Sequence, residues 1–145
     1  MTQDELAQAC ADAMWADDKA TQHLGMQLSE VRAGHATMTM TVRPEMTNGH
    51  KICHGGYIFT LSDSAFAFAC NTYNQRVVAQ MAQVTFLAPA FEGDVLRAEA
   101  REVWKQGRGG IYDITVTRAD GVKIAEFRGH SRSIKGTHLP DPSQE

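Results

Sequence analysis

The sequence predicts an α+β fold in which one curved antiparallel sheet packs around a single long helix. The strongest observation is an apolar segment at residues 57–70, where ten of 14 side chains are apolar and only Asp63 is ionised. A helix that is apolar almost all round belongs in a core. Segments of alternating polarity precede and follow it, as in half-buried strands. Short connections between the later segments favour antiparallel pairing.

The part of the chain before the apolar helix predicts one short helix and two strands. Thr2 and Glu5 have the spacing of a capping box, and apolar side chains then recur at helical spacing, so we expect an amphipathic helix over residues 3–20. Residues 35–42 alternate strictly between apolar and polar side chains. They predict a half-buried strand, paired with a shorter one near residues 26–32.

The part after the apolar helix predicts four strands joined by short turns, which we expect to form an antiparallel meander. These strands are predicted at residues 77–87, 94–104, 111–118 and 122–134. We therefore predict a single domain over residues 1–135, followed by a disordered tail at 136–145. Because the helix is apolar all round, it needs cover on the side away from the sheet. We expect both that the sheet curls around it and that a second subunit covers it.

Composition excludes several classes of function. The 145 residues suit one domain with a normal core. A net charge of −3 with interleaved signs gives no indication of nucleic-acid or membrane binding. No stretch approaches the ~20 apolar residues of a membrane span, and the N-terminal region lacks the apolar part of a signal peptide. Three cysteines without a CxxC spacing indicate a reduced, cytoplasmic protein without structural zinc.

Asp63 is the first candidate for chemistry, because a lone carboxylate in a buried helix is costly unless it is used, paired or protonated. A structural carboxylate is the alternative. Phe59, Phe66 and Ala67 lie within one turn of Asp63 and predict an apolar collar that raises its pKa. The carboxylate could then act as a general base toward water or attack a substrate directly, and the sequence leaves both routes open.

A second candidate is the start of the same helix at Gly55 and Gly56. Backbone N–H groups in a first helical turn are unpaired and lie at the positive end of the helix dipole, so the Gly55 amide can stabilise an oxyanion. Asp63 is eight residues later, or roughly 12 Å along the axis at about 1.5 Å per residue. One helix cannot bring both groups to one reacting carbonyl. We therefore predict a site built from two antiparallel helices of a dimer.

The loop before the helix adds Asn48 and His54. Asn48 would orient water or the substrate carbonyl, and His54 would brace the loop or donate a hydrogen bond near the reacting group. Asn48-Gly49 as a simple turn, and His54 as loop architecture, are the alternatives. A metal site at His50 and His54 lacks a helix and a further ligand, and a Cys53–His54 nucleophile lacks an orienting third group.

In these motifs the chain resembles the hotdog-fold acyl-CoA thioesterases, in particular the PaaI type of phenylacetate degradation, over roughly residues 5–136. The resemblance is carried by Asn48-Gly49-His50, Cys53-His54-Gly55-Gly56, Leu61-Ser62-Asp63-Ser64-Ala65-Phe66-Ala67, Val84-Thr85-Phe86-Leu87-Ala88-Pro89, and Gly107-Arg108 with Tyr112-Asp113. It implies a hotdog fold, edge-to-edge dimers that usually form tetramers, and hydrolysis of a CoA thioester with Asp63 as the catalytic carboxylate.

The resemblance also directs attention to the groups that would hold the substrate. Many relatives carry a basic residue where this chain has Ala88, so other cations must hold the CoA phosphates here. Lys105 and Arg108 are the first choices, with Arg128, Arg132 and Lys51 as rivals. Gly56 at the helix start and the aromatic side chains of Tyr57, Phe59 and Phe66 are expected to line the acyl site.

The predicted function is therefore hydrolysis of aromatic CoA thioesters, of the phenylacetyl or hydroxyphenylacetyl type, in phenylacetate catabolism. CoA is part of the substrate, and we expect no separate cofactor or metal. A hotdog dehydratase or hydratase, which would pair Asp63 with His54, is one alternative. A non-catalytic acyl-CoA-binding protein is the other.

Overall fold

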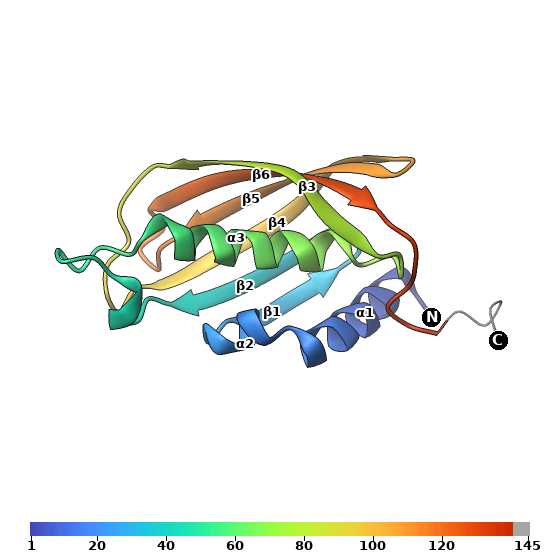
Figure 1. The fold of residues 1–145 in the computed structure, drawn as a ribbon, viewed down its shortest axis with the longest axis horizontal. Helices are drawn as coiled ribbons and strands as arrows, with labels where there is room; N and C mark the ends of the chain where they lie inside the picture. Colours follow the sequence, from blue (N-terminus) through green and yellow to red (C-terminus); the bar gives the residue numbers. More distant parts are fainter. Residues whose placement is uncertain (141–145) are drawn as a thin grey trace.

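The computed structural model describes residues 1–140 and contains three α-helices, a short 3-10 helix and six strands (Figure 1). Their bounds are α1 Gln3–Asp17, α2 Lys19–His23, β1 Gln27–Arg32, β2 His35–Thr41, the 3-10 helix Pro44–Met46, α3 Gly55–Cys70, β3 Val77–Phe86, β4 Val95–Gln106, β5 Gly109–Thr117 and β6 Lys123–Ser133. Every predicted strand is present, and α3 coincides with the predicted apolar helix.

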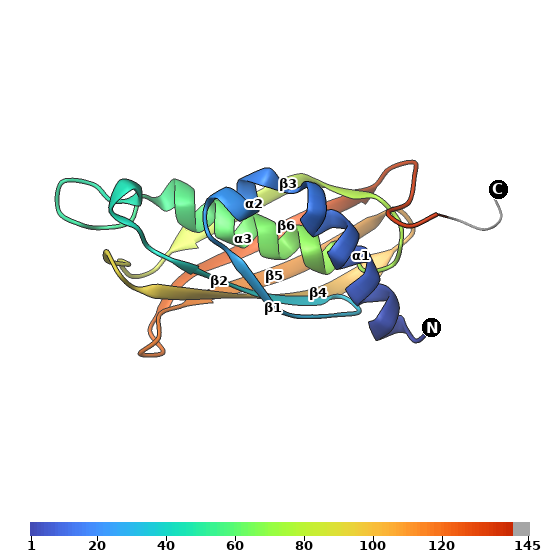
Figure 2. The same cartoon turned by 90° about the horizontal axis from the view of Figure 1, so that it is seen from below.

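The strands form one antiparallel sheet in the order β1-β2-β4-β5-β6-β3. Helix α3 lies along one face of this sheet, and α1 and α2 lie on the same side (Figures 1 and 2). The sheet curves, so that β2 and β3 flank α3 from opposite sides. This arrangement confirms the predicted α+β hotdog fold.

The predicted four-strand meander is wrong at one strand. Strands β4, β5 and β6 follow one another as expected, but β3 pairs with β6 at the sheet edge, far from β4. The segment between β3 and β4 is held elsewhere, because the Cys53 N–H donates to the Ala90 carbonyl at 2.8 Å and Ile52 bridges to Phe91. It crosses the start of α3 instead of making a hairpin, and so encloses that helix end.

The core lies between the sheet and α3, and strict alternation along the strands builds it. The inward side chains of β2, β4 and β5 are fully buried, whereas their neighbours point outward. On α3, every residue from Leu61 to Cys70 is buried except Asp63 and Ala67. The core cluster includes Met38, Met40, Leu61, Ala65, Phe66, Leu96, Ala98, Tyr112, Ile114 and Phe127.

The predicted N-terminal helix is two helices that meet at Asp18. Thr2 caps α1 as expected, accepting the Glu5 N–H at 3.1 Å. The chain then turns at Asp18, whose ψ of 84° is not helical, and the Asp18 side chain caps α2. An aspartate whose side chain accepts an N–H group in the first turn of the next helix favours such a break.

The side of α3 away from the sheet is only partly covered. Gly56, Phe59, Thr60, Asp63 and Ala67 are half-buried or exposed, at helical spacing, and we call these five residues the open stripe. Phe59 keeps 36% of its surface exposed. The prediction that the sheet alone does not cover this helix is consistent with that exposure.

The segment predicted as a disordered tail begins with defined contacts. The His138 and Leu139 N–H groups donate to Asn74 Oδ1 at 3.1 and 2.9 Å, and the His138 ring bonds Asn71 Oδ1 at 2.7 Å. Disorder is therefore the wrong description of residues 136–139. Of the rest of the predicted tail, residue 140 is described and residues 141–145 lie outside the described residues.

Candidate active site

The start of α3 presents free backbone donors, as predicted. His54 is the N-cap residue, with extended backbone angles, and its side chain makes no capping bond. Tyr57 N–H bonds back to the His54 carbonyl, whereas within residues 1–140 the Gly55 and Gly56 N–H groups have no acceptor. Two unpaired amides at the positive end of a 16-residue helix can bind a developing negative oxygen.

Gly55 is needed here because an aromatic ring occupies the place of its missing side chain. A Cβ on Gly55 would lie 2.8 Å from Cζ of Phe86. Gly55, Ile58, Phe86 and residues 87–90 line a cavity of about 460 Å³ together with Ile52 and Cys53, which we call the apolar cavity. The sequence indicated the residues but not the cavity, because it forms only where the β3–β4 segment crosses the helix start.

The loop before α3 is braced by Asn48. Its Oδ1 accepts the N–H groups of His50 at 2.9 Å and Ile52 at 3.1 Å. Its side-chain amide nitrogen has no acceptor within residues 1–140, so this exposed side chain still has donors to offer. The turn and the substrate-orienting interpretations of Asn48 are therefore compatible, since they use different atoms of one side chain.

The other polar groups of this loop, His54 and Cys53, are weaker candidates for a catalytic role. The exposed His54 ring makes no hydrogen bond or ion pair with another described residue, and it does not pair with Asp63 within the chain. Burial raises the pKa of the Cys53 thiol to about 11, so it is protonated at neutral pH and is a poor nucleophile. Within residues 1–140, no three His, Cys, Asp or Glu side chains gather as a metal site would require.

Asp63 lies midway along the open stripe. The half-buried carboxylate has no hydrogen-bond or ion-pair partner among the described residues. Burial raises its pKa above the ordinary value, and the negative charge of Asp18 adds to that rise. A carboxylate whose pKa is raised while it stays accessible is a stronger base toward water.

The predicted collar around Asp63 is only partly correct. Phe59 lies on the open stripe and packs edge-on against Phe127, with ring centroids 5.2 Å apart. Phe66 instead points into the core, between Tyr112 and Phe127, and its ring covers Gly129 so closely that a Cβ there would lie 2.8 Å away. Since Phe66 is 1% exposed, its assignment to the acyl site is wrong. Tyr57 is half-buried near the helix start.

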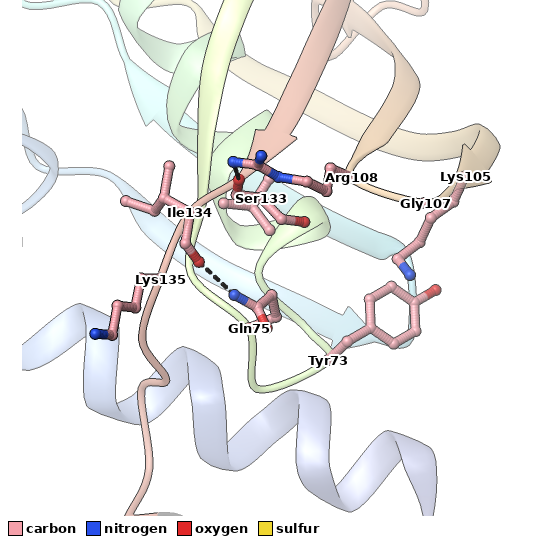
Figure 3. Close-up of a pocket in the computed structure, with 9 residues that line it drawn as sticks. Tyr73, Gln75, Lys105, Gly107, Arg108, Ser133, Ile134 and Lys135 are labelled. Carbon is pink, nitrogen blue, oxygen red and sulfur yellow. Dashed lines mark hydrogen bonds between the residues drawn. The ribbon is translucent and has the colours of Figure 1, made fainter.

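The predicted phosphate-binding cations gather at the other end of α3. Lys105 and Arg108, from the β4–β5 hairpin, line a pocket of about 580 Å³ with Tyr73, Gln75 and Lys135, which we call the cationic pocket (Figure 3). Lys105 Nζ lies 4.7 Å from the centre of the Tyr73 ring, and Arg108 donates to the Ser133 carbonyl at 3.1 Å. Among residues 1–140, no carboxylate lines this pocket. It is therefore suited to an anionic group.

The sequence did not single out Lys135, which joins the pocket because the end of β6 runs beside the β4–β5 hairpin. Of the rival cations, Arg128 is committed to Asp113 through two contacts of 2.6 and 2.8 Å on the outer face of the sheet. Arg132 and Lys51 are exposed and do not line the cationic pocket. Its composition therefore favours Lys105 and Arg108 over these rivals.

One chain does not assemble all of these groups. Gly55 begins α3 and Asp63 follows eight residues later, about 12 Å along the axis. The cationic pocket lies beyond the opposite end of the helix, near Tyr73 (Figure 3). The two candidate halves of the site are thus separated along α3.

Among the described helices, none is long and apolar enough to span a bilayer.

Comparison with known proteins gives concordant matches. The thioesterase superfamily profile matches residues 50–125. The acyl-coenzyme A thioesterase PaaI of Escherichia coli (strain K12) is 41% identical over 127 residues, which cover 88% of this chain and 91% of that protein. The structure of the E. coli PaaI protein from the phenylacetic acid degradation operon superposes with a TM-score of 0.92 at 39% identity, covering 94% and 99% of the two chains. A mutant of the phenylacetic acid degradation protein PaaI from Thermus thermophilus gives 0.77 at 30% identity, covering 81% and 100%.

Proposed function

This chain belongs to the thioesterase superfamily and is a thioester hydrolase, and from that premise we propose that it hydrolyses aromatic acyl-CoA thioesters of the phenylacetyl or hydroxyphenylacetyl type. The coenzyme A part of this proposal is supported by the name of the E. coli relative. The aromatic part is supported by the phenylacetic acid degradation operon from which that relative's structure derives. The products are the free acid and CoA.

The observation that carries the proposal is the position of Asp63, half-buried on the open stripe and without a hydrogen-bond or ion-pair partner among the described residues. Acting as general base, its carboxylate takes a proton from a water whose oxygen attacks the thioester carbon. The carbonyl oxygen becomes an oxyanion that accepts the Gly55 N–H, with the Asn48 amide as a further donor. The intermediate then collapses, the C–S bond breaks, and CoA leaves as a thiolate that is reprotonated.

We place each active site between two chains. Two α3 helices that cross antiparallel around a two-fold axis bring Asp63 of one chain near Gly55 of the other. The same pairing turns the cationic pocket of one chain toward the start of the partner's α3. A substrate whose thioester is held at the partner's Gly55 would then extend its CoA phosphates toward this pocket. Exposed apolar side chains on α3 and along the edge strand β3 support this pairing surface, among them Phe59, Val78, Met81 and Phe86.

The substrate preference follows from the surroundings of Gly55. The apolar cavity adjoins the proposed oxyanion donor and is bordered by Ile58, Phe86 and Pro89. Transfer of an aromatic acyl group from water to this apolar cavity is favourable, whereas transfer of a charged acyl group costs hydration free energy. We therefore expect phenylacetyl-type thioesters to be preferred over succinyl- or malonyl-CoA.

The first experiment measures thiol release from a panel of acyl-CoAs by the wild type and by Asp63→Asn. We expect wild-type hydrolysis with aromatic thioesters preferred, and a loss of about 10²–10⁴-fold in kcat for the variant. Asp12→Asn, which changes an exposed carboxylate on α1, is the matched control and should retain activity. Full activity of Asp63→Asn would overturn the assigned base, and absence of hydrolysis would overturn the proposal for these substrates.

A second experiment tests the shared site. Asp63→Asn and Gly55→Ala chains, each weakly active alone, are mixed and exchanged. With sites formed across the two-fold axis, each hybrid dimer holds one unaltered site, so random exchange should restore about a quarter of wild-type activity. If every site lay within one chain, mixing would restore nothing.

A further inference from the structure

A buried chain of hydroxyl groups connects the α1–α2 junction to α3. Asp18 Oδ1 accepts the Thr21 N–H at 3.1 Å, and its Oδ2 accepts the Thr21 hydroxyl at 2.7 Å. Thr21 Oγ1 also lies 2.8 Å from Ser64 Oγ. A threonine hydroxyl has a single proton, which here goes to Asp18, so the Ser64 hydroxyl donates to Thr21. The chain therefore runs in one direction, from Ser64 to the Asp18 carboxylate.

This connection is buried and lies directly beside the proposed base. Thr21 is 1% exposed and Ser64 is 8% exposed. Ser64 follows Asp63 in sequence, so the hydrogen bond holds the same turn of α3 from the side next to the open stripe. One turn further along, Trp15 of α1 packs against Phe68 of α3, with ring centroids 6.2 Å apart. These two contacts set the rotation of α3 against α1 and α2.

The half-buried Asp18 also brings a negative charge to this place. Within residues 1–140 it forms no ion pair, and the adjacent Lys19 ammonium donates instead to the Ala16 carbonyl. Capping of the Thr21 N–H alone does not require a carboxylate, because asparagine caps equally well. Capping of α2 therefore does not by itself account for the negative charge at this position.

We propose that Asp18 is a positioning residue for Asp63, fixing its helical turn through Thr21 and Ser64 and making the Asp63 carboxylate a stronger base by repulsion. This inference rests on the proposed role of Asp63 in thioester hydrolysis. A negative charge next to the base disfavours its ionised form, which is the form that gains a proton during attack by water. Asp18 itself touches no substrate in this account.

The other ionisable groups around Asp63 do not supply the same effect. On α3 itself, burial raises the pKa of the Cys70 thiol to about 12, so it is neutral. On β5, the phenol of Tyr112 is neutral too, because burial raises its pKa and its hydroxyl donates to Glu102 of β4. Strand β3 carries no ionisable side chain. Across the α1–α2 junction, Asp17 is exposed, and Arg76 and His138 line a cavity with Asp18.

The proposal is tested with variants that separate the charge from the hydrogen bonds. Asp18→Asn removes the charge but keeps both contacts with Thr21, because its oxygen still accepts the Thr21 N–H and its amide group donates to the Thr21 hydroxyl, which then donates to Ser64. Thr21→Val keeps the charge but removes the link to Ser64. The readout is the pH dependence of kcat/KM for a thioester that the wild type hydrolyses. We expect the acid limb of Asp18→Asn to move to lower pH, with a several-fold lower plateau. Thr21→Val should lower the plateau and leave the limb in place.

The controls keep the outcomes distinct. Asp12→Asn removes one negative charge elsewhere on α1 and should not move the limb, because distant exposed charges are screened. An unmoved limb in a folded Asp18→Asn protein, with Asp63→Asn inactive, would overturn this inference alone. Activity of Asp63→Asn, or a wild type without an acid limb, would instead overturn the assignment of the base on which it rests.

Discussion

The two sides of α3 differ in how completely they are packed. Toward the sheet, Leu61, Ala65 and Phe66 are fully enclosed. Away from it, the open stripe leaves Phe59 exposed, and Asp63 has no partner within residues 1–140. One helix thus has a packed face that contributes stability and a separate face that carries the proposed catalytic carboxylate. The groups with unused bonding capacity are those that the fold leaves uncovered.

The largest expected effect tests the enclosed side. Phe66→Ala should lower the free energy of unfolding by about 3–5 kcal/mol, because a cavity opens between Gly129, Tyr112 and Phe127. Its counterpart on the open stripe, Phe59→Ala, should cost only about 1 kcal/mol, mainly the edge-on contact with Phe127. Urea unfolding measures both. Equal losses would show that the two sides do not differ in packing.

Gly55→Ala addresses the end of α3 where the open stripe begins. The new Cβ would meet the Phe86 ring, so the ring or the helix start must shift, and kcat/KM should fall about 10- to 100-fold, somewhat less than when an oxyanion donor is removed outright. Gly49→Ala, where a Cβ has open space, is the matched control. Adding Phe86→Ala to Gly55→Ala should recover part of the loss. No recovery would mean that crowding is not the cause.

A smaller effect is expected at the cationic pocket. Lys105→Ala should raise KM for an acyl-CoA about two- to fivefold with little change in kcat, since an exposed charge pair contributes modestly. Added salt should reduce the difference between wild type and variant. Lys123→Ala, whose ammonium pairs with Glu126 at 2.9 Å, is the control. A purely kcat effect of Lys105→Ala would contradict a binding role.

The last prediction concerns the effect of pH on stability through Asp63. Because its pKa is raised in the folded state, the folded protein binds the proton more tightly than the unfolded chain. This group therefore favours folding below the unfolded pKa of about 3.9, and that contribution is lost as the pH rises through the folded pKa. Asp63→Asn should then be more stable than the wild type at pH 7, by chemical denaturation. A destabilised variant would show that the carboxylate has a structural partner.

The order of the elements, and the positions of the candidate residues Gly55 and Asp63 on α3, could be predicted from local patterns. Alternation and helical periodicity depend on neighbouring residues, and they located every strand and the helix that carries Asp63. The place of β3 beside β6 could not be predicted, because pairing between distant strands leaves no local trace. Phe66 was assigned to the wrong side for a related reason. Its surroundings, Gly129 and Tyr112, come from strands 46 or more residues away.

Lys135 and Asp18 show the same limit at the candidate site. Both lie outside the motifs around α3 and join the site through tertiary contacts, one at the end of β6 and the other at the α1–α2 junction. A surface lysine and a helix-capping aspartate are common features, so neither has a local signal of function. Local patterns indicated the candidate residues that the backbone of α3 positions, but not those that tertiary packing brings close to them.

The arrangement of the chain ends has a practical consequence for handling the protein. Residue 1 and the last described residues lie toward the same end of the molecule, the end to which α3 runs (Figure 1). Neither residue 1 nor the last described residues lie at the Gly55 end. An affinity tag or fusion partner at the N-terminus would thus lie toward the end of the molecule that carries Tyr73, so kinetics should be compared before and after tag removal. A fluorescent label for reporting events at Gly55 is better attached in the exposed loop at residues 49–51.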